Sequence, residues 1–461
     1  MSDASAAIQE PAPDSAPTAR ARIFEIPKVS AITALTLAVA DMIGTGVFTS
    51  LGFQVRDIPS GFSLLMLWVV GGVVAMCGAL SYSELAAAFP RSGGEYNFLS
   101  RTFHPAIGFL AGWISATVGF AAPVALAAMA FGQYFAGVVP GAPAALLGLG
   151  VTILVTLVHL SGNQRGAVFQ NVTTIMKLVL IAVLIVAGLV WGQPQNISFL
   201  PSAADAEYIT GAPFAIGLVF VLYAYSGWNA ATYIAGEIDE PHRNLPRSII
   251  AALLIVTGLY VLLNAVFLYT TPIGELRGQL DVGLIAGRHI FGDAGGRLVA
   301  ALICIGLVSS ISAMMWIGPR VTMVMGEDIP LLRFFSKKTR NGVPATAILF
   351  QLAAVTALML TQSFEKVLDY IQFALTFSSF LTVLGVIVLR YSQPDLPRPY
   401  RAWAYPVTPF IFLAVTLFVL YYLATERPQE SLYSLCTILA GLLIYAISII
   451  YTNLRDRRTA P

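Results

Sequence analysis

Two glycines in the middle of an apolar stretch have the spacing of a broken helix that could bind a charged ligand. Gly44 and Gly46 flank one threonine inside an apolar run that begins near Ser30 and ends near Val55. Because glycine costs roughly 1 kcal/mol relative to alanine in a helix interior, we expect this run to break there. A half-helix starting at Gly46 would direct free N–H groups and a positive dipole end at a cavity, which suits a carboxylate. The two glycines could instead form a small-residue face on which another helix packs. The pair alone does not decide between a broken helix and a packing face.

Two charged residues also stand in apolar surroundings. Lys177 is the only basic residue within Val168–Trp191. A charge at the centre of a membrane helix costs about 2.5–3.5 kcal/mol on insertion scales, so an unpaired structural lysine is disfavoured. Lys177 could be a permanently charged residue that joins helices, as a strut, or it could carry a proton. Its central position argues against a side chain that snorkels to the membrane surface. Asp41 lies about one helical turn before Gly44 and could pair with Lys177, change protonation during a working cycle, bond to nearby backbone, or face an aqueous vestibule.

The composition is that of a polytopic membrane protein. Of 461 residues, 57% are hydrophobic and 11% are charged, whereas soluble domains carry about 25% charged residues. No basic tract suggests nucleic acid, and the four scattered histidines offer neither metal-ligand spacing nor a catalytic constellation. We therefore expect no metal, no cofactor and no enzyme activity. Cys77, Cys304 and Cys436 all lie in apolar runs, which argues against a disulfide framework.

Apolar runs of about 20 residues predict an all-α polytopic membrane protein with twelve transmembrane helices. Residues 1–27 lack an apolar core and are expected to form a disordered cytoplasmic tail, and 454–461 a second cytoplasmic tail. The expected helices lie near 30–55, 62–89, 104–138, 144–161, 168–192, 211–236, 247–271, 296–326, 343–362, 366–390, 404–425 and 431–453.

The sixth expected helix contains a second interruption. Its centre, residues 223–229, reads Tyr-Ala-Tyr-Ser-Gly-Trp-Asn between apolar flanks. Breaks in helices 1 and 6 lie five helices apart, which is typical of a transporter with two inverted repeats and its site between them. The expected repeats are 28–192 and 211–390, with helices 11 and 12 in 391–453; their sequences show no strong identity. Lys and Arg concentrate in the segments that this topology places inside, so both termini are expected in the cytoplasm.

Four segments in a fixed order carry a family resemblance. They are Met-Ile-Gly-Thr-Gly-Val-Phe at 42–48, the stretch 81–96 that ends Pro-Arg-Ser-Gly-Gly-Glu-Tyr, Tyr-Ser-Gly-Trp-Asn at 225–229 with the following 236–247, and 398–409. Together they resemble the amino acid–polyamine–organocation (APC) superfamily, and within it the L-type amino acid transporter-like branch. The resemblance covers roughly Lys28 to Leu454.

This resemblance implies a 5+5 inverted repeat, alternating access, and an α-amino acid bound between the two broken helices. The substrate carboxylate is expected at the backbone N–H groups around Thr45, Gly46 and Val47, with the Thr45 hydroxyl beside them. An anion at a half-helix N-terminus and a cation at unwound carbonyls agree with the electrostatics of broken helices. The carbonyl groups expected to receive the α-ammonium are those of Ile43, Tyr223, Ala224 and Ser226.

Further side chains take roles from the same resemblance. Tyr223 falls where the family has an aromatic gate that closes over the substrate. Packing between helices is the alternative, and the position of Tyr223 at the break favours the gate. Phe120 and Ala121, just before Pro123, match positions of the side-chain pocket. Asn229 matches a polar position on helix six near the site.

Lys177 matches a lysine that this branch has in helix five, where sodium-dependent relatives bind an ion. The resemblance implies that it links helix one to helix eight, with Ser309 and Ser310 as its partners and Ser310 at the family position. A fixed ammonium would replace the sodium ion electrostatically. Asp41 departs from the family, which has a small or hydroxyl residue there, so a coupling role for Asp41 stays open beside the strut.

The function expected from the resemblance is sodium-independent secondary transport of neutral L-amino acids across the plasma (inner) membrane, by exchange or facilitated transport. No acidic residue stands plainly at the expected side-chain pocket. Glu84 and Glu95 belong to the 81–96 motif and are expected to latch helices near the cytoplasmic face. The alternatives are a proton-coupled symporter using Lys177 or Asp41, and a transporter-like amino acid sensor.

The expected partners are an amino acid substrate and membrane lipids. Eukaryotic L-type transporters pair with a single-span heavy chain through a cysteine between helices three and four. The corresponding loop, residues 139–143, contains no cysteine. No disulfide-linked heavy chain is therefore expected.

Overall fold

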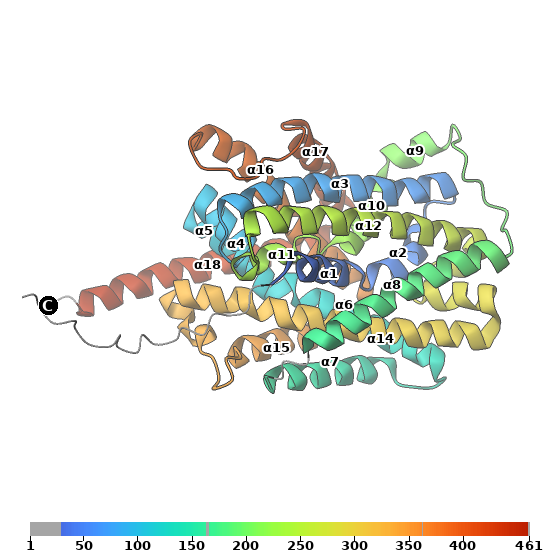
Figure 1. Ribbon diagram of the computed structural model, residues 1–461, viewed down its shortest axis with the longest axis horizontal. Helices are drawn as coiled ribbons and strands as arrows, with labels where there is room; N and C mark the ends of the chain where they lie inside the picture. Colours follow the sequence, from blue (N-terminus) through green and yellow to red (C-terminus); the bar gives the residue numbers. More distant parts are fainter. Residues whose placement is uncertain (1–28, 163–165, 362, 460–461) are drawn as a thin grey trace, which may run out of the picture.

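Long helices running in nearly the same direction build the molecule (Figure 1). The computed structural model describes residues 29–162, 166–361 and 363–459, so the expected N-terminal tail, 1–27, lies outside the described residues. Within these ranges no β-strand forms, and one isolated bridge pairs Val29 with Ile238. The all-α prediction is confirmed.

Nine helical stretches of the described chain are long and apolar enough to cross a membrane, and the shorter apolar helices Ala144–Leu160, Ala212–Tyr225 and Ala345–Thr361 complete the twelve expected spans. The helices are α1 (Ala31–Met42), α2 (Gly46–Gln54), α3 (Gly61–Ala88), α4 (Glu95–Thr102), α5 (Pro105–Ile114), α6 (Ala121–Val138), α7 (Ala144–Leu160), α8 (Gly166–Trp191), α9 (Asp205–Thr210), α10 (Ala212–Tyr225), α11 (Ala230–Tyr233), α12 (Pro241–Thr270), α13 (Ile273–Leu276), α14 (Val282–Asp328), α15 (Ala345–Thr361), α16 (Phe364–Ser392), α17 (Val407–Glu426) and α18 (Pro428–Thr459).

The outer surface of the bundle is apolar, as a lipid environment requires. Large aliphatic side chains such as Leu154 of α7, Val186 of α8 and Leu443 of α18 are more than half exposed. In water such a surface would be costly, whereas lipid tails accept it. The chain is therefore a multi-pass membrane protein.

Two helices are longer than the sequence indicated. α14 joins two helical segments across Gly292, whose φ of 75° lies in the left-handed region that favours glycine. Its first segment precedes the expected start at 296. α18 continues to Thr459, past the expected tail boundary at 453, because a helix can project from the membrane into water.

The first and sixth spans are interrupted, as the sequence predicted. α1 ends at Met42 and α2 begins at Gly46, while α10 ends at Tyr225 and α11 begins after Gly227, which has a left-handed φ of 99°. α2 packs on α10, and α1 packs on α11. The two broken helices thus run antiparallel with their breaks side by side, which is the arrangement of an inverted repeat.

The third span contains a different irregularity. Between α5 and α6, residues Ser115–Gly119 form one π-helical turn, η1, and Phe120 follows with its N–H bonded to Ser115 O at 3.2 Å. Such turns insert one residue into a helix and frequently mark functional sites. The turn lines the same cavity as the break of the sixth span.

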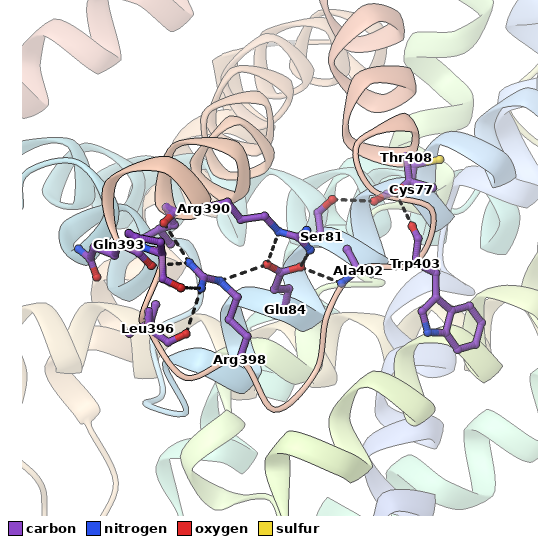
Figure 2. A network of polar contacts seen from close by, with 12 residues as sticks. Cys77, Ser81, Glu84, Arg390, Gln393, Leu396, Arg398, Ala402, Trp403 and Thr408 are labelled. Atoms are coloured by element: carbon purple, nitrogen blue, oxygen red, sulfur yellow. Dashed lines mark hydrogen bonds and ion pairs between the residues drawn. The ribbon is translucent and has the colours of Figure 1, made fainter.

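Glu84 of α3 fastens three segments at one end of the bundle (Figure 2). Arg390 of α16 donates from Nε at 3.0 Å and from Nη2 at 2.6 Å, and the Ala402 N–H donates at 2.7 Å. Arg398 Nε lies 3.5 Å from the same carboxylate. A bidentate arginine contact is among the stronger side-chain pairings, so Glu84 is the helix latch that the sequence predicted.

Gly46→Ala is expected to destabilise the fold by about 1–3 kcal/mol through overpacking, since a Cβ there would lie 2.5 Å from Cα and Cβ of Ala224. Gly258→Ala is the matched control, because nothing lies within 4 Å of its added Cβ. Thermal unfolding in detergent should show a lowered apparent melting temperature for the first variant alone. Equal melting temperatures would mean that the two breaks do not constrain each other.

Candidate functional site

The last turn of α1 and the break in the sixth span border a cavity of about 90 Å³. Asp41 of α1 and residues 226–229 of the sixth span form part of its wall, and the π-helical turn with Phe120 forms another part. Positions on α16 and α17 complete it. A buried water needs roughly 10–15 Å³ of such space, so the cavity has room for several waters or one small polar molecule.

Four of the sequence-predicted site residues line this cavity. They are Asp41, Phe120, Ser226 and Asn229. The direct packing of Gly46 on Ala224 closes the space between the breaks at that level, so the remaining predicted residues of these helices are buried behind the wall. These are Ile43, Thr45, Gly46, Val47, Ala121, Tyr223 and Ala224.

The start of α2 retains free backbone donors. Within the described residues, the N–H groups of Thr45, Gly46 and Val47 have no acceptor. The next N–H, of Phe48, bonds to Thr45 O at 3.1 Å. The hydroxyl of Tyr223 lies beside the Thr45 side chain. Three free donors at the positive end of a nine-residue helix can hold an anion once this contact opens.

Two carbonyl groups of the sixth-span break already accept hydrogen bonds. Tyr223 O accepts from the N–H of Ser226 at 3.0 Å and from its hydroxyl at 2.6 Å. Ala224 O lies 3.1 Å from the Tyr260 hydroxyl, which is also 2.5 Å from Met42 O. One phenol of α12 therefore bridges both breaks. A carbonyl oxygen has two lone pairs. Both are in use at Tyr223 O, whereas Ala224 O can accept a further donor.

Lys177 of α8 is buried where α1 ends. Its Nζ donates to Ile43 O at 2.8 Å, to Ala40 O at 3.2 Å and to Ser310 Oγ at 2.7 Å. An ammonium has three donors, and these contacts use all three. A cation at the C-terminal end of a helix is also favoured by the helix dipole. Lys177 thereby ties the broken first span to α8 and α14.

Ser309 and Asp41, the other two residues considered as partners of Lys177, make no hydrogen bond or direct ion pair with it. Ser309 accepts a 2.7 Å bond from Thr173 of α8 rather than from Lys177. Among the described ion pairs none joins Asp41 to Lys177, and Oδ1 of Asp41 is buried without a hydrogen-bond partner. Asp41 instead abuts Gly227, where an added Cβ would lie 2.7 Å from its Oδ2. Asp41 and Lys177 form no direct ion pair, although the two buried charges lie near enough to act on each other through space.

Several cavity residues escaped the sequence analysis. Glu95 of α4 latches helices as expected, because it accepts hydrogen bonds from the hydroxyls of Tyr82 on α3 and of Ser378 and Ser379 on α16. Its place in the cavity wall was not expected. Three polar side chains of α16 also line the cavity. Their i, i+4, i+7 spacing within an apolar span is the helical signal that could have found them. They are Gln372, Thr376 and Ser379.

An aromatic stack closes the bundle beyond α2. The Phe53 ring lies 5.0 Å from that of Phe220 on α10 and 5.8 Å from that of Phe364 on α16, measured between centroids. Arg56 lies over Phe53 and pairs with Glu365 at 3.1 Å. These contacts join both broken spans to α16 on the side of the breaks away from Glu95.

Twelve apolar spans, two of them broken beside a cavity that has polar groups in its wall, define a membrane transporter. Comparison with protein-family models agrees: residues 29–448 match the amino acid permease model. The chain therefore belongs to the amino acid permease family of the APC superfamily, as the sequence resemblance predicted. Its relatives are transporters and not enzymes.

The relatives span most of the chain. The b(0,+)-type amino acid transporter 1 of Mus musculus is 28% identical over 92% of this chain and 88% of its own length. The serine/threonine exchanger SteT of Bacillus subtilis (strain 168) is 27% identical over 91% of this chain and 96% of its own. The large neutral amino acids transporter small subunit 2 of Mus musculus is 24% identical over 92% and 82%.

Lys177→Met is expected to lower amino acid transport in proteoliposomes at least ten-fold. Each hydrogen bond to a charged group contributes about 1.5–3 kcal/mol, and methionine replaces none of the three. Lys366→Met, at the exposed lysine near the start of α16, is the control and should stay within about two-fold of the wild type. Wild-type transport by a folded Lys177→Met variant would remove this lysine from the mechanism.

Proposed function

We propose that this protein is a sodium-independent amino acid transporter of the plasma (inner) membrane that works by alternating access. The observation that carries this proposal is the three-fold coordination of the Lys177 ammonium between α1 and α14. A permanent cation there supplies the positive charge that a bound sodium ion would otherwise bring to the end of the broken helix. Transport then needs no sodium.

The backbone groups of an amino acid would bind at the two breaks. Its carboxylate would accept from the free N–H groups of Thr45, Gly46 and Val47, and its ammonium would donate to carbonyls of the sixth span, including Ser226 O. Because Gly46 now packs on Ala224, binding requires α2 and α10 to separate at this level. Movement of Tyr223 away from Thr45 would open the same space, which is the behaviour of a gate.

One side of the two breaks is sealed and the other borders the cavity, which fits one end state of an alternating-access cycle. The Phe53 stack and the Arg56–Glu365 pair seal the side beyond α2, whereas the cavity reaches Glu95 on the other side. The excess of Lys and Arg in the segments that this topology places inside supports a cytoplasmic location for both termini and for the Glu95 side. The conformation is then closed to the outside.

Neutral amino acids belong to the proposed substrates. Phe120, Trp228, Met314 and Phe412 supply apolar wall against which an uncharged side chain can pack. Relatives named as a serine/threonine exchanger and a large neutral amino acids transporter support this proposal. The sequence argument for neutral substrates rested on a side-chain pocket without an evident acidic residue, whereas Asp41 and Glu95 line the cavity.

The chain is proposed to work without a disulfide-linked partner. Residues 139–143, between α6 and α7, contain no cysteine. Cys77 and Cys304 are buried in the bundle, and Cys436 lies on α18. Membrane lipids contact the exposed apolar faces.

Proton-coupled symport is the second candidate, because the buried Asp41 carboxylate has an oxygen without a partner in the described structure. A carboxylate in that position can take up a proton when the cavity is open to water. Proton coupling would use Asp41, and Lys177 would remain a strut.

Uptake of labelled L-serine into sodium-free proteoliposomes tests both candidates. Exchange predicts uptake that rises at least ten-fold when vesicles are preloaded with unlabelled amino acid and that ignores an inward proton gradient. Accumulation in empty vesicles driven by protons would establish the symporter instead. A requirement for sodium would contradict the role given to Lys177, and binding without uptake would identify a sensor.

A further inference from the structure

We infer that a second cavity, at the lipid-facing surface of the bundle, binds an acyl chain of an anionic phospholipid whose headgroup lies on a basic segment beside it. This cavity measures about 200 Å³ and is lined by residues of α5, α14, α15 and α18 and of the short 3₁₀ helix η3 (Pro330–Ser336). It is separate from the cavity at the helix breaks, because Ala116 of the π-helical turn lines it, whereas Ser115 and Gly119 of the same turn line the other.

The wall of the second cavity presents an apolar surface. Three phenylalanines form one side of it: the ring of Phe335 lies 4.0 Å from that of Phe334 and 5.2 Å from that of Phe350, measured between centroids. Engineered apolar cavities of about 150 Å³ stay dry and bind apolar molecules such as benzene. The ligand that matches this wall is therefore hydrocarbon and not a polar solute.

Contacts between the surrounding segments hold the cavity open. The indole N–H of Trp113 donates to Thr437 O of α18 at 3.0 Å, and the Thr346 hydroxyl of α15 donates to Phe334 O at 2.9 Å. The backbone of η3 packs on Gly326 of α14, where an added Cβ would lie 2.8 Å from it. Protein interiors seldom leave voids larger than a water molecule. A fixed void of this size is best explained by a ligand that fills it.

The cavity reaches the lipid-facing surface where η3 meets α15 and α18. Phe334 in its wall is 47% exposed. Leu349 and Leu443, the chain neighbours of the lining residues Phe350 and Ile444, are 50% and 66% exposed. Since such a surface lies among lipid tails, an acyl chain can enter the cavity sideways from the bilayer without crossing water.

A basic segment begins at the same place. Arg333, Lys337, Lys338 and Arg340 are exposed, and residues 329–344 contain no aspartate or glutamate. None of these four cations takes part in an ion pair of the described chain. Lysine and arginine at a membrane surface attract anionic lipid headgroups. Because Arg333 directly precedes Phe334 of the cavity wall, one lipid can contact the cations and the cavity together.

Both features are needed to select a lipid. Acyl chains surround every lipid-facing surface of a membrane protein and are as apolar as its side chains, so the cavity alone does not distinguish one phospholipid from another. The basic segment alone would attract any anion. Together they favour a phospholipid with a net negative headgroup over a zwitterionic one with the same chains.

The test measures how phosphatidylglycerol and phosphatidylcholine with identical acyl chains stabilise the full chain in detergent. At equal concentration the anionic lipid should raise the apparent melting temperature by roughly 3 °C or more above the effect of the zwitterionic lipid, because a ligand of the native state stabilises it. Ile444→Trp, which fills the cavity from α18, should abolish this difference. Leu443→Trp, at the neighbouring exposed position of α18, is the matched control and should keep it.

The headgroup is tested separately. Lys337→Gln combined with Lys338→Gln should reduce the preference for phosphatidylglycerol at least two-fold, whereas Lys366→Gln, at an exposed lysine of α16, should not change it. Glycerol 3-phosphate, which has the charge without the chains, should not stabilise the protein. Stabilisation by glycerol 3-phosphate equal to that by the lipid would make the site a phosphate site and overturn the inference.

Photo-crosslinking with phosphatidylglycerol that carries a diazirine in its acyl chain gives a readout that remains if Ile444→Trp fails to fold. Labelling should fall on the cavity wall, including Met325 and Phe334, at least five-fold above that by the matching phosphatidylcholine probe. Equal stabilisation by the two lipids, or a preference that survives Ile444→Trp, would overturn the inference. So would cross-links between two copies of the chain at these residues in place of lipid. These readouts do not depend on transport, so the proposed function is tested independently of them.

Discussion

The break in the first span leaves the last carbonyl groups of α1 pointing into the interior of an apolar bundle, where water cannot satisfy them. Unpaired backbone in such a place costs several kcal/mol for each group. Polar side chains from neighbouring spans donate hydrogen bonds to these carbonyl groups. Lys177 donates to Ile43 O and Ala40 O, and Tyr260 donates to Met42 O. Without them the chain could not remain unwound at this depth, and α2 would not begin with free N–H donors.

These contacts also explain the surrounding packing. The Lys177 side chain runs along Gly306 of α14, where an added Cβ would lie 3.1 Å from Cγ of the lysine. Close approach of α8 and α14 therefore depends on a small residue at this point. The ammonium then reaches Ser310 one turn further along α14. One side chain fixes the spacing of three spans, which makes the lysine a structural element as much as an electrostatic one.

The sequence predicted the features that follow from local chemistry. Glycine and small polar residues inside apolar runs located both breaks, and a lone lysine in an apolar helix required partners, of which Ser310 was named. The cavity wall was harder, because it depends on which face of each span turns inward. Gly46 turns toward Ala224 and away from the cavity. Glu95 latches helices as predicted, but a short motif does not reveal that it also lines the cavity.

The hydrogen bonds of Tyr260 restrict how the two breaks can move relative to each other. Its single hydroxyl hydrogen is shared between Met42 O of the first span and Ala224 O of the sixth. If α1 and α10 drew apart, one of these carbonyls would lose its donor in a dry environment. The less costly motion keeps both carbonyls against the phenol, so that the end of α1 and the end of α10 travel as one body. On this account the ends of α1 and α10 stay fixed against α12, and α2 and α11 are the half-helices that move.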